Sequence, residues 1–252
     1  MTELLYLPNA DAAYERRFSA RVTALPPGGA VLDRTLFYPT GGGQPCDLGV
    51  LAASDGSEWG VADVAKSGPA VVHRLARRGS TRSTLSIGSE VTGTIDWERR
   101  YRHMRAHTFQ HLLSARVFVL SGRRTRRASL SASGGHVDVE GPWPAAVAWA
   151  DVDADVRAHL DLALPVNVRM IPRAAYEAAP GDRSGLVPLP PHVDPVRLVE
   201  IEEADRCPCG GTHVRSTSEV GSYRLAAPQA MGGGDVRVAF TLTAGGPPTP
   251  TA

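Results

Sequence analysis

The pattern of apolar and polar residues changes once along the chain. Up to about residue 95, short apolar stretches alternate with turn-forming residues, and each stretch has the length of a strand rather than a helix. Strands this short and evenly spaced are typical of a small β-barrel. The expected strands cover residues 4–7, 20–25, 30–33, 49–53, 71–75 and 91–97.

A long helix is predicted where the pattern changes. Residues 99–120 contain no Pro or Gly, and their apolar side chains recur at helical spacing. Gly122 follows as the expected C-terminal cap. Beyond it we expect a second helix at residues 145–162, strands at 136–140, 167–171 and 196–201, and a hairpin of 221–226 with 236–242.

These elements predict an α+β fold. An amino-terminal small β-barrel is followed by an α+β domain that combines an antiparallel sheet with the long helix. We place the boundary so that the two domains cover residues 1–95 and 96–244. Residues 245–252 hold too few apolar side chains to pack, and we expect a disordered tail there.

Composition narrows the class of protein. The 252 residues carry 27 Lys plus Arg against 26 Asp plus Glu, so no overall charge excess indicates a nucleic acid or a membrane as partner. No apolar run approaches the ~18 residues of a bilayer span, and the first residues lack a secretory pattern. Three cysteines, two of them at Cys207 and Cys209, form a poor disulfide framework. We therefore expect a cytoplasmic protein whose reduced thiols are available to a metal.

Two distant segments carry residues with metal-ligand chemistry. His107 and His111 lie four apart on the predicted helix, which puts both imidazoles on one face. Cys209 and His213 enclose residues 210–212, whose two glycines let the backbone turn tightly enough for thiolate and imidazole to converge. Thiolate and imidazole favour zinc over magnesium or calcium. The four residues predict a tetrahedral site for one Zn²⁺ per chain.

Spacing alone leaves the ligand set open. His103 continues the face of His107 one turn earlier, and Cys207 offers a second thiol. Each has a simpler interpretation, His103 as a surface residue of a basic helix and Cys207 as a packed residue. A lone pair of histidines at this spacing is more often bonded to backbone or carboxylate than to a metal. The Cys-Gly-Gly-Thr-His segment is what favours the metal.

Five motifs resemble one family. The runs 107–113 and 209–214 resemble the paired zinc motifs of the alanyl-tRNA editing proteins, the AlaX family, and of the editing domain of alanyl-tRNA synthetase; threonyl-tRNA synthetase has a related domain. Residues 32–39, the glycine loop at 41–45 and residues 95–100 are similar to its longer members. The similarity covers roughly residues 3 to 243.

The resemblance implies a free-standing, zinc-dependent deacylase that removes a wrong amino acid from tRNA, with a β-barrel packed on an α+β editing domain. It also implies which residues bind zinc: His107, His111, Cys209 and His213, rather than His103 and Cys207. Four protein ligands usually mark a closed structural site. Catalysis would need a loose ligand, an expanded coordination shell, or a metal that holds the substrate's amino group. No residue stands out as general base.

The resemblance further implies a pocket for the amino acid. The family's glycine loop is associated with amino acid selection, and a Gln or Thr downstream of the first zinc histidine is linked to sensing the serine hydroxyl. Here that region reads Arg123–Ser129, so an arginine takes the sensing place and Thr125 and Ser129 are the nearest hydroxyls. The expected substrate is Ser-tRNA(Ala)-like, or tRNA carrying glycine or an unusual β-substituted, threonine-like amino acid. The expected pocket residues are Gly41, Gly42, Gly43, Gln44, Thr125, Ser129 and Thr212.

The nearly neutral net charge of the chain conceals one strongly basic stretch. Residues 99–127 contain nine arginines and no acidic residue. Such charge attracts phosphates by releasing counterions, although like-charged stretches are often merely solvated. The arginines expected to bind the acceptor end of tRNA are Arg99, Arg100, Arg102, Arg105, Arg123, Arg124, Arg126 and Arg127.

Two other functions would use the same residues. One is a zinc hydrolase of small aminoacyl esters or thioesters outside translation, which would not need the arginines. The other is a non-catalytic tRNA-binding module whose zinc is structural, which would unfold without metal and never hydrolyse the ester.

Overall fold

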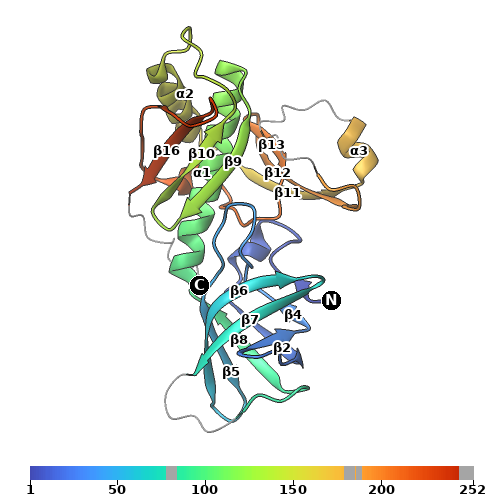
Figure 1. The fold of residues 1–252 in the computed structure, drawn as a ribbon. Helices are drawn as coiled ribbons and strands as arrows, with labels where there is room; N and C mark the ends of the chain where they lie inside the picture. Colours follow the sequence, from blue (N-terminus) through green and yellow to red (C-terminus); the bar gives the residue numbers. More distant parts are fainter. Residues whose placement is uncertain (78–83, 179–184, 186–188, 244–252) are drawn as a thin grey trace.

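The computed structural model describes residues 1–77, 84–178, 185 and 189–243. Over these residues the chain has a mixed α and β fold with antiparallel sheets, as the sequence predicts (Figure 1). The predicted tail, 245–252, lies outside the described residues. None of the helices in the described ranges combines the length and the apolar character that a membrane span requires.

Six antiparallel strands form a closed barrel in the order β2-β3-β7-β6-β5-β8. Inward side chains alternate with exposed ones, so that Phe18 and Val22 of β2 pack with Leu51 in one apolar core. Gly93 makes room for Phe18, because a Cβ at this position would overlap the ring. The barrel strands are β2 (Arg17–Ala24), β3 (Gly29–Leu32), β5 (Gly49–Ala53), β6 (Glu58–Ser67), β7 (Ala70–Arg77) and β8 (Glu90–Ile95).

The expected strand at residues 4–7 is reduced to two residues. β1 (Glu3–Leu4) pairs in parallel with β4 (Arg34–Thr35) outside the barrel. A 3-10 helix, η1 (Asp11–Tyr14), follows β1 and packs Ala13 into the core of the other part of the molecule. The amino-terminal residues therefore contact both parts.

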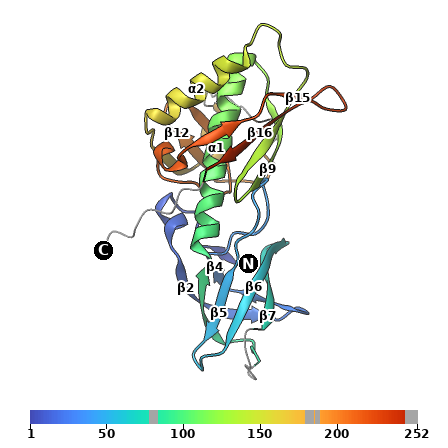
Figure 2. The ribbon, with the colours of Figure 1, turned by 90° about the vertical axis from the view of Figure 1, so that its left-hand side faces the viewer.

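The predicted long helix is confirmed as α1 (Trp97–Ser121). Asp96 caps its start by accepting the N–H of Arg99 at 3.1 Å, and Gly122 ends it in the left-handed region with φ of 69°. Both views show α1 running from the barrel into the other part (Figures 1 and 2). Most of its middle residues are buried, including polar ones, because sheets, α2 and a loop of the barrel part surround it.

The second part contains two antiparallel sheets. The larger has the order β14-β16-β10-β9, with β15 paired to β16, and packs with α1 and α2 around one apolar core. The smaller has the order β11-β12-β13. The strands and the further helices of this second part are β9 (Thr125–Ser131), β10 (Gly134–Val139), α2 (Trp149–Asp161), β11 (Val166–Ile171), α3 (Arg173–Ala178), β12 (Val196–Ile201), β13 (Asp205–Pro208), η2 (Thr217–Val220), β14 (Tyr223–Leu225), β15 (Gln229–Ala230) and β16 (Val236–Leu242).

Residues 36–48, between β4 and β5, extend from the barrel along α1, and we call them the connecting segment. Asp47 forms a fully buried ion pair with Arg100, and the Cys46 carbonyl accepts from Arg99 Nε at 3.0 Å. Further along, the Gly43 carbonyl accepts the N–H of Leu130 in β9 at 2.9 Å. These contacts fix the glycine loop beside the middle of α1.

Candidate metal centre

Three imidazoles and one thiol converge in the second part of the molecule. His107 and His111 come from the middle of α1, and Cys209 and His213 come from the turn after β13. One ligand atom of each lies within 4.8 Å of the others. Cys209 Sγ is 3.5 Å from His107 Nε2 and 3.4 Å from His213 Nε2. Ligands around a tetrahedral zinc ion are about 3.3–3.7 Å apart, so this spacing fits one ion.

The outer nitrogens of two rings are held by hydrogen bonds. His107 Nδ1 lies 2.8 Å from Gln44 Oε1, and His111 Nδ1 lies 2.9 Å from Asp205 Oδ2. Both partners accept, so each Nδ1 carries a proton, and each Nε2 is the ring nitrogen that faces the centre. This arrangement orients metal-binding histidines in proteins.

His213 is supported from α1. Its Nδ1 is 3.2 Å from the Thr108 hydroxyl, which also accepts the N–H of Val214 at 3.2 Å. The residue that follows the first ligand in sequence therefore supports the last ligand. All three histidines are buried, whereas Cys209 is half-buried.

One glycine lets the ligand turn approach α1. A Cβ on Gly211 would overlap the His107 ring and lie 3.1 Å from Gln44 Oε1. A Cβ on Gly210 would meet no atom within 4 Å. Of the two glycines in the motif, only Gly211 is required by close packing.

The charges in the cluster suit a cation. Burial raises the pKa of Cys209, but His107 and His111 outweigh burial and hold that pKa well below its ordinary value. Burial and the neighbouring His107 lower the pKa of His213 well below normal. Burial also acts to lower the pKa of His111, yet the Cys209 thiolate and Asp205 raise it to about 10. A divalent ion would take the place of the second proton that His111 otherwise holds, so the donor set fits zinc.

The two alternative ligands are not part of the cluster. His103 is 1% exposed, and its Nδ1 is buried without a hydrogen-bond partner among the described residues. Burial and the charge of Arg99 lower its pKa to about 4. The interpretation of His103 as a surface residue is therefore wrong, because the connecting segment contacts α1 on either side of it. Cys207 is a packed residue, its Sγ 3.6 Å from the Pro208 carbonyl and its pKa raised by burial.

Part of the predicted pocket adjoins the ligands. Gln44 and Thr212 are fully buried and bonded to each other at 2.9 Å. Gly43 has φ of 83°, and a Cβ there would lie 2.5 Å from the Ala128 carbonyl. The Tyr38 hydroxyl donates to the Gly41 carbonyl at 2.8 Å, close to Gly42.

The two predicted hydroxyls on β9 differ in their surroundings. Thr125 is buried and donates to Ser114 Oγ at 2.8 Å, so its hydrogen is already used within the protein. Ser129 is exposed, opposite His136 of β10. Within the described residues neither hydroxyl is hydrogen-bonded to one of the four cluster residues, and their part in the pocket stays a prediction.

Two of the predicted tRNA-binding arginines are structural. Arg100 is 0% exposed, and besides Asp47 it donates to the Ala13 carbonyl at 2.9 Å. Arg105 is 3% exposed and donates to the carbonyls of Val220 and Thr243. The prediction that these two contact tRNA is wrong, because other parts of the protein enclose their guanidinium groups.

The other predicted arginines lie nearer the surface. Arg99 and Arg123 are half-buried. Arg102 and Arg126 are exposed and pair with Glu98 at 3.1 Å and Asp235 at 3.0 Å. The remaining two are exposed: Arg124 lies just before β9 and Arg127 lies within it.

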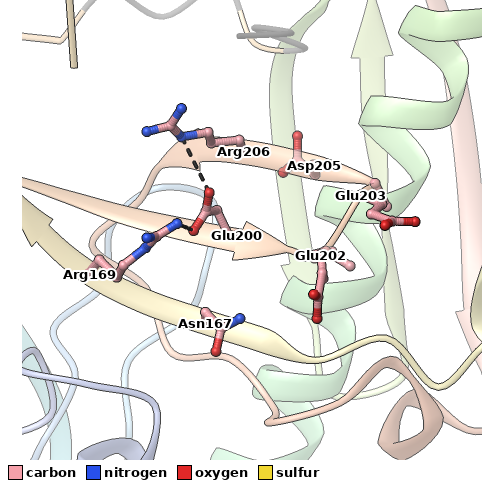
Figure 3. A pocket seen from close by; sticks show the side chains of 9 residues that line it. Asn167, Arg169, Glu200, Glu202, Glu203, Asp205 and Arg206 are labelled. Carbon is pink, nitrogen blue, oxygen red and sulfur yellow. Dashed lines mark hydrogen bonds and ion pairs between the residues drawn. The ribbon is translucent and has the colours of Figure 1, made fainter. Parts of the chain in front are cut away.

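Sequence reasoning missed Asp205, the partner of His111. Asp205 is also one of the residues that line a shallow hollow of about 350 Å³ at the end of the smaller sheet. In this hollow Glu200 pairs with both Arg169 and Arg206 (Figure 3). The available signal was an acidic residue four positions before Cys209, but no spacing rule links it to His111.

Two segments of the chain match known protein families, and both families are parts of tRNA synthetases. Residues 196–238 match the family described as threonyl and alanyl tRNA synthetase second additional domain, and residues 10–99 match the family described as tRNA synthetases class II (A). The chain is thus related to tRNA synthetases at both ends of the described structure. The first of these matches contains two of the four cluster residues, Cys209 and His213.

Full-length relatives then give the family. The chain is 33% identical to the alanyl-tRNA editing protein AlaX-M of Methanosarcina barkeri and 30% identical to that of Saccharolobus solfataricus, covering 96% of this chain and 99% of each relative. It is 36% identical to the alanine–tRNA ligase of Pyrobaculum calidifontis, of which it spans 26%. The chain belongs to the alanyl-tRNA editing protein family.

Proposed function

We propose that the chain is a zinc-dependent, trans-editing deacylase of misacylated tRNA. Its relatives are named for editing alanyl-tRNA, and deacylation of tRNA is hydrolysis of the ester between the amino acid and the terminal ribose. This makes the chain a hydrolase of carboxylic ester bonds. The observation that carries the zinc assignment is the convergence of His107, His111, Cys209 and His213.

Zinc, when bound, supplies a Lewis acid and lowers the pKa of water towards about 7. The chain keeps two ligands in the form the ion needs, since Gln44 and Asp205 hold the Nδ1 protons of His107 and His111. Cys209 is the one half-buried ligand and is followed by exposed Gly210. We infer that the aminoacyl end of tRNA approaches from this side.

The other assignments rest on the arrangement around the cluster. We propose residues 1–95 as a barrel domain and 96–244 as the editing domain, because there are two separate apolar cores and, of the buried residues described before 96, only Ala13 belongs to the second. For the edited amino acid we propose serine or a β-substituted, threonine-like residue, with the loop Gly41–Gly43 as the part of the pocket nearest the ligands. Support for the loop comes from the contact of its next residue, Gln44, with His107.

A deacylation panel tests the function. The purified chain is incubated with tRNA(Ala) and other tRNAs charged with serine, glycine, alanine or threonine-like amino acids, and with small aminoacyl esters. We expect at least one misacylated tRNA to lose its amino acid far faster than background, while Ala-tRNA(Ala) stays charged. Equal hydrolysis of small esters would indicate a hydrolase outside translation. Binding of tRNA with every ester intact would indicate a non-catalytic module, and either result would overturn the proposal.

The exposed arginines predict a salt-dependent effect. Replacing Arg124 and Arg127 with Gln is expected to weaken tRNA binding and to reduce the slope of log affinity against log salt by up to about 2, because each lost phosphate contact removes roughly 0.7–0.9. Hydrolysis of a small ester, if detectable, should not change. The measurement is tRNA affinity at several salt concentrations. The control is Arg157→Gln, an exposed arginine on α2 outside this stretch. An unchanged slope in the double variant would remove these two residues from the tRNA interface.

A further inference from the structure

Gln44 reaches the metal centre from outside the two segments that carry its ligands. It lies 63 residues before His107, on the connecting segment, and is fully buried. Its Oε1 is 2.8 Å from His107 Nδ1 and accepts the N–H of Thr212 at 3.2 Å. Its Nε2 donates to the Thr212 hydroxyl at 2.9 Å. One side chain thus links α1 to the turn between Cys209 and His213.

The backbone N–H of Thr212 settles which way the amide faces. A backbone N–H only donates, so the Gln44 atom that it meets is the oxygen. The same oxygen faces His107 Nδ1, which must therefore carry the proton and donate as well. His107 Nε2, on the side of Cys209, is then the nitrogen left to bind the ion.

The connecting segment is anchored independently of the cluster. Asp47 and Cys46 contact Arg100 and Arg99 on the first turn of α1, and Gly43 bonds to β9. Gln44 lies between these anchors. Its position is therefore set by contacts that need no metal.

We propose that Gln44 is a positioning residue of the metal centre: it holds His107 in the tautomer and orientation that bind the ion, and it ties the ligand turn to α1. This rests on the proposed zinc centre. It also gives Gln44 a role different from amino acid selection, because both ends of its amide are used within the protein.

Zinc affinity of the full chain tests this role, measured by competition with a chromophoric chelator, together with the visible spectrum of the Co²⁺-loaded protein. Gln44→Leu removes all three hydrogen bonds, to His107 and to Thr212, and is expected to weaken zinc binding by about 10–100-fold and to change the Co²⁺ spectrum. Gln44→Glu should bind zinc at least as tightly as the parent, because a carboxylate still accepts from His107 and from Thr212. The matched control is Gln110→Leu. It removes another buried amide of the same part, bonded to Ser114 at 2.9 Å.

The outcomes separate this role from a general loss of packing. Unchanged zinc affinity in Gln44→Leu would overturn it, and so would an equal loss in Gln110→Leu or a failure of Gln44→Glu to retain binding. Thermal unfolding of the metal-free variants shows whether each is folded. If the parent chain itself binds no zinc, both the proposed centre and the role of Gln44 are wrong. If the parent chain binds zinc, the variants test the role of Gln44 separately from the centre.

Discussion

Gly211→Ala is expected to lower zinc affinity and the rate of tRNA deacylation by about 100-fold or more, since misplacing a group at a site by about 1 Å has effects of this size. The added methyl group would overlap the His107 ring, so either the imidazole or the ligand turn must move. The measurements are zinc affinity by chelator competition and the initial rate of deacylation of the best substrate in the panel.

The neighbouring glycine supplies the control. Gly210→Ala adds the same methyl group at an exposed position with no atom within 4 Å, and it should keep affinity and rate close to those of the parent. Equal losses in the two variants would show that backbone freedom in the turn, rather than contact with His107, explains the glycine pair. Full retention in Gly211→Ala would contradict the geometry of the cluster.

Asp47→Ala is expected to reduce the free energy of unfolding by about 3–5 kcal/mol, because it leaves the Arg100 charge buried without its partner. Both side chains are fully buried, and Asp47 also accepts the N–H of Tyr38 at 2.7 Å. The measurement is urea unfolding followed by circular dichroism. The effect should reach the metal centre, because Asp47 anchors the connecting segment that carries Gln44.

An exposed ion pair provides the comparison. Glu90→Ala breaks the pair with Arg21 on the barrel, where both side chains are more than half exposed, and should change the free energy of unfolding by about 0–1 kcal/mol. If Asp47→Ala is no more destabilising than Glu90→Ala, Arg100 is not held in a closed interior. Arg100 would then be available to tRNA again.

The sequence predicted the elements whose local pattern was uninterrupted. α1 followed from residues free of Pro and Gly and from the cap at Gly122. β12 was predicted to the residue because its four aliphatic side chains are bounded by the Pro-rich loop before them and by polar residues after them. β6 was missed, although it is the longest barrel strand, because a register shift between Val61 and Asp63 breaks its alternation.

A second strand that was not predicted, β9, begins within the basic stretch of residues 99–127. β9 carries Arg126 and Arg127, and its run of arginines and small residues was interpreted as charge rather than as a strand. Its side chains show no strand pattern, and the strand is stabilised by its pairing with β10. Strands of this kind are defined by their neighbours in the sheet.

The ligands of the candidate site could be predicted, but their supports could not. Spacing selected His107 with His111 and Cys209 with His213, and the structure brings these four together. No sequence motif relates the position of Asp205 to that of His111, the ligand that it supports. The burial of Arg100 was equally invisible, since its partner Asp47 comes from another part of the chain. Helical and turn spacing is local, whereas these contacts depend on how the barrel part and α1 pack.

The most direct test of the central claim is X-ray absorption at the zinc edge of the full chain loaded with one equivalent of metal. A centre of three imidazoles and one thiolate should give one sulfur at about 2.3 Å and three nitrogens at about 2.0–2.1 Å. Cys209→Ser should remove the sulfur signal. A shell of oxygen and nitrogen alone in the parent protein, or no retained zinc, would contradict a centre built from three imidazoles and one thiolate.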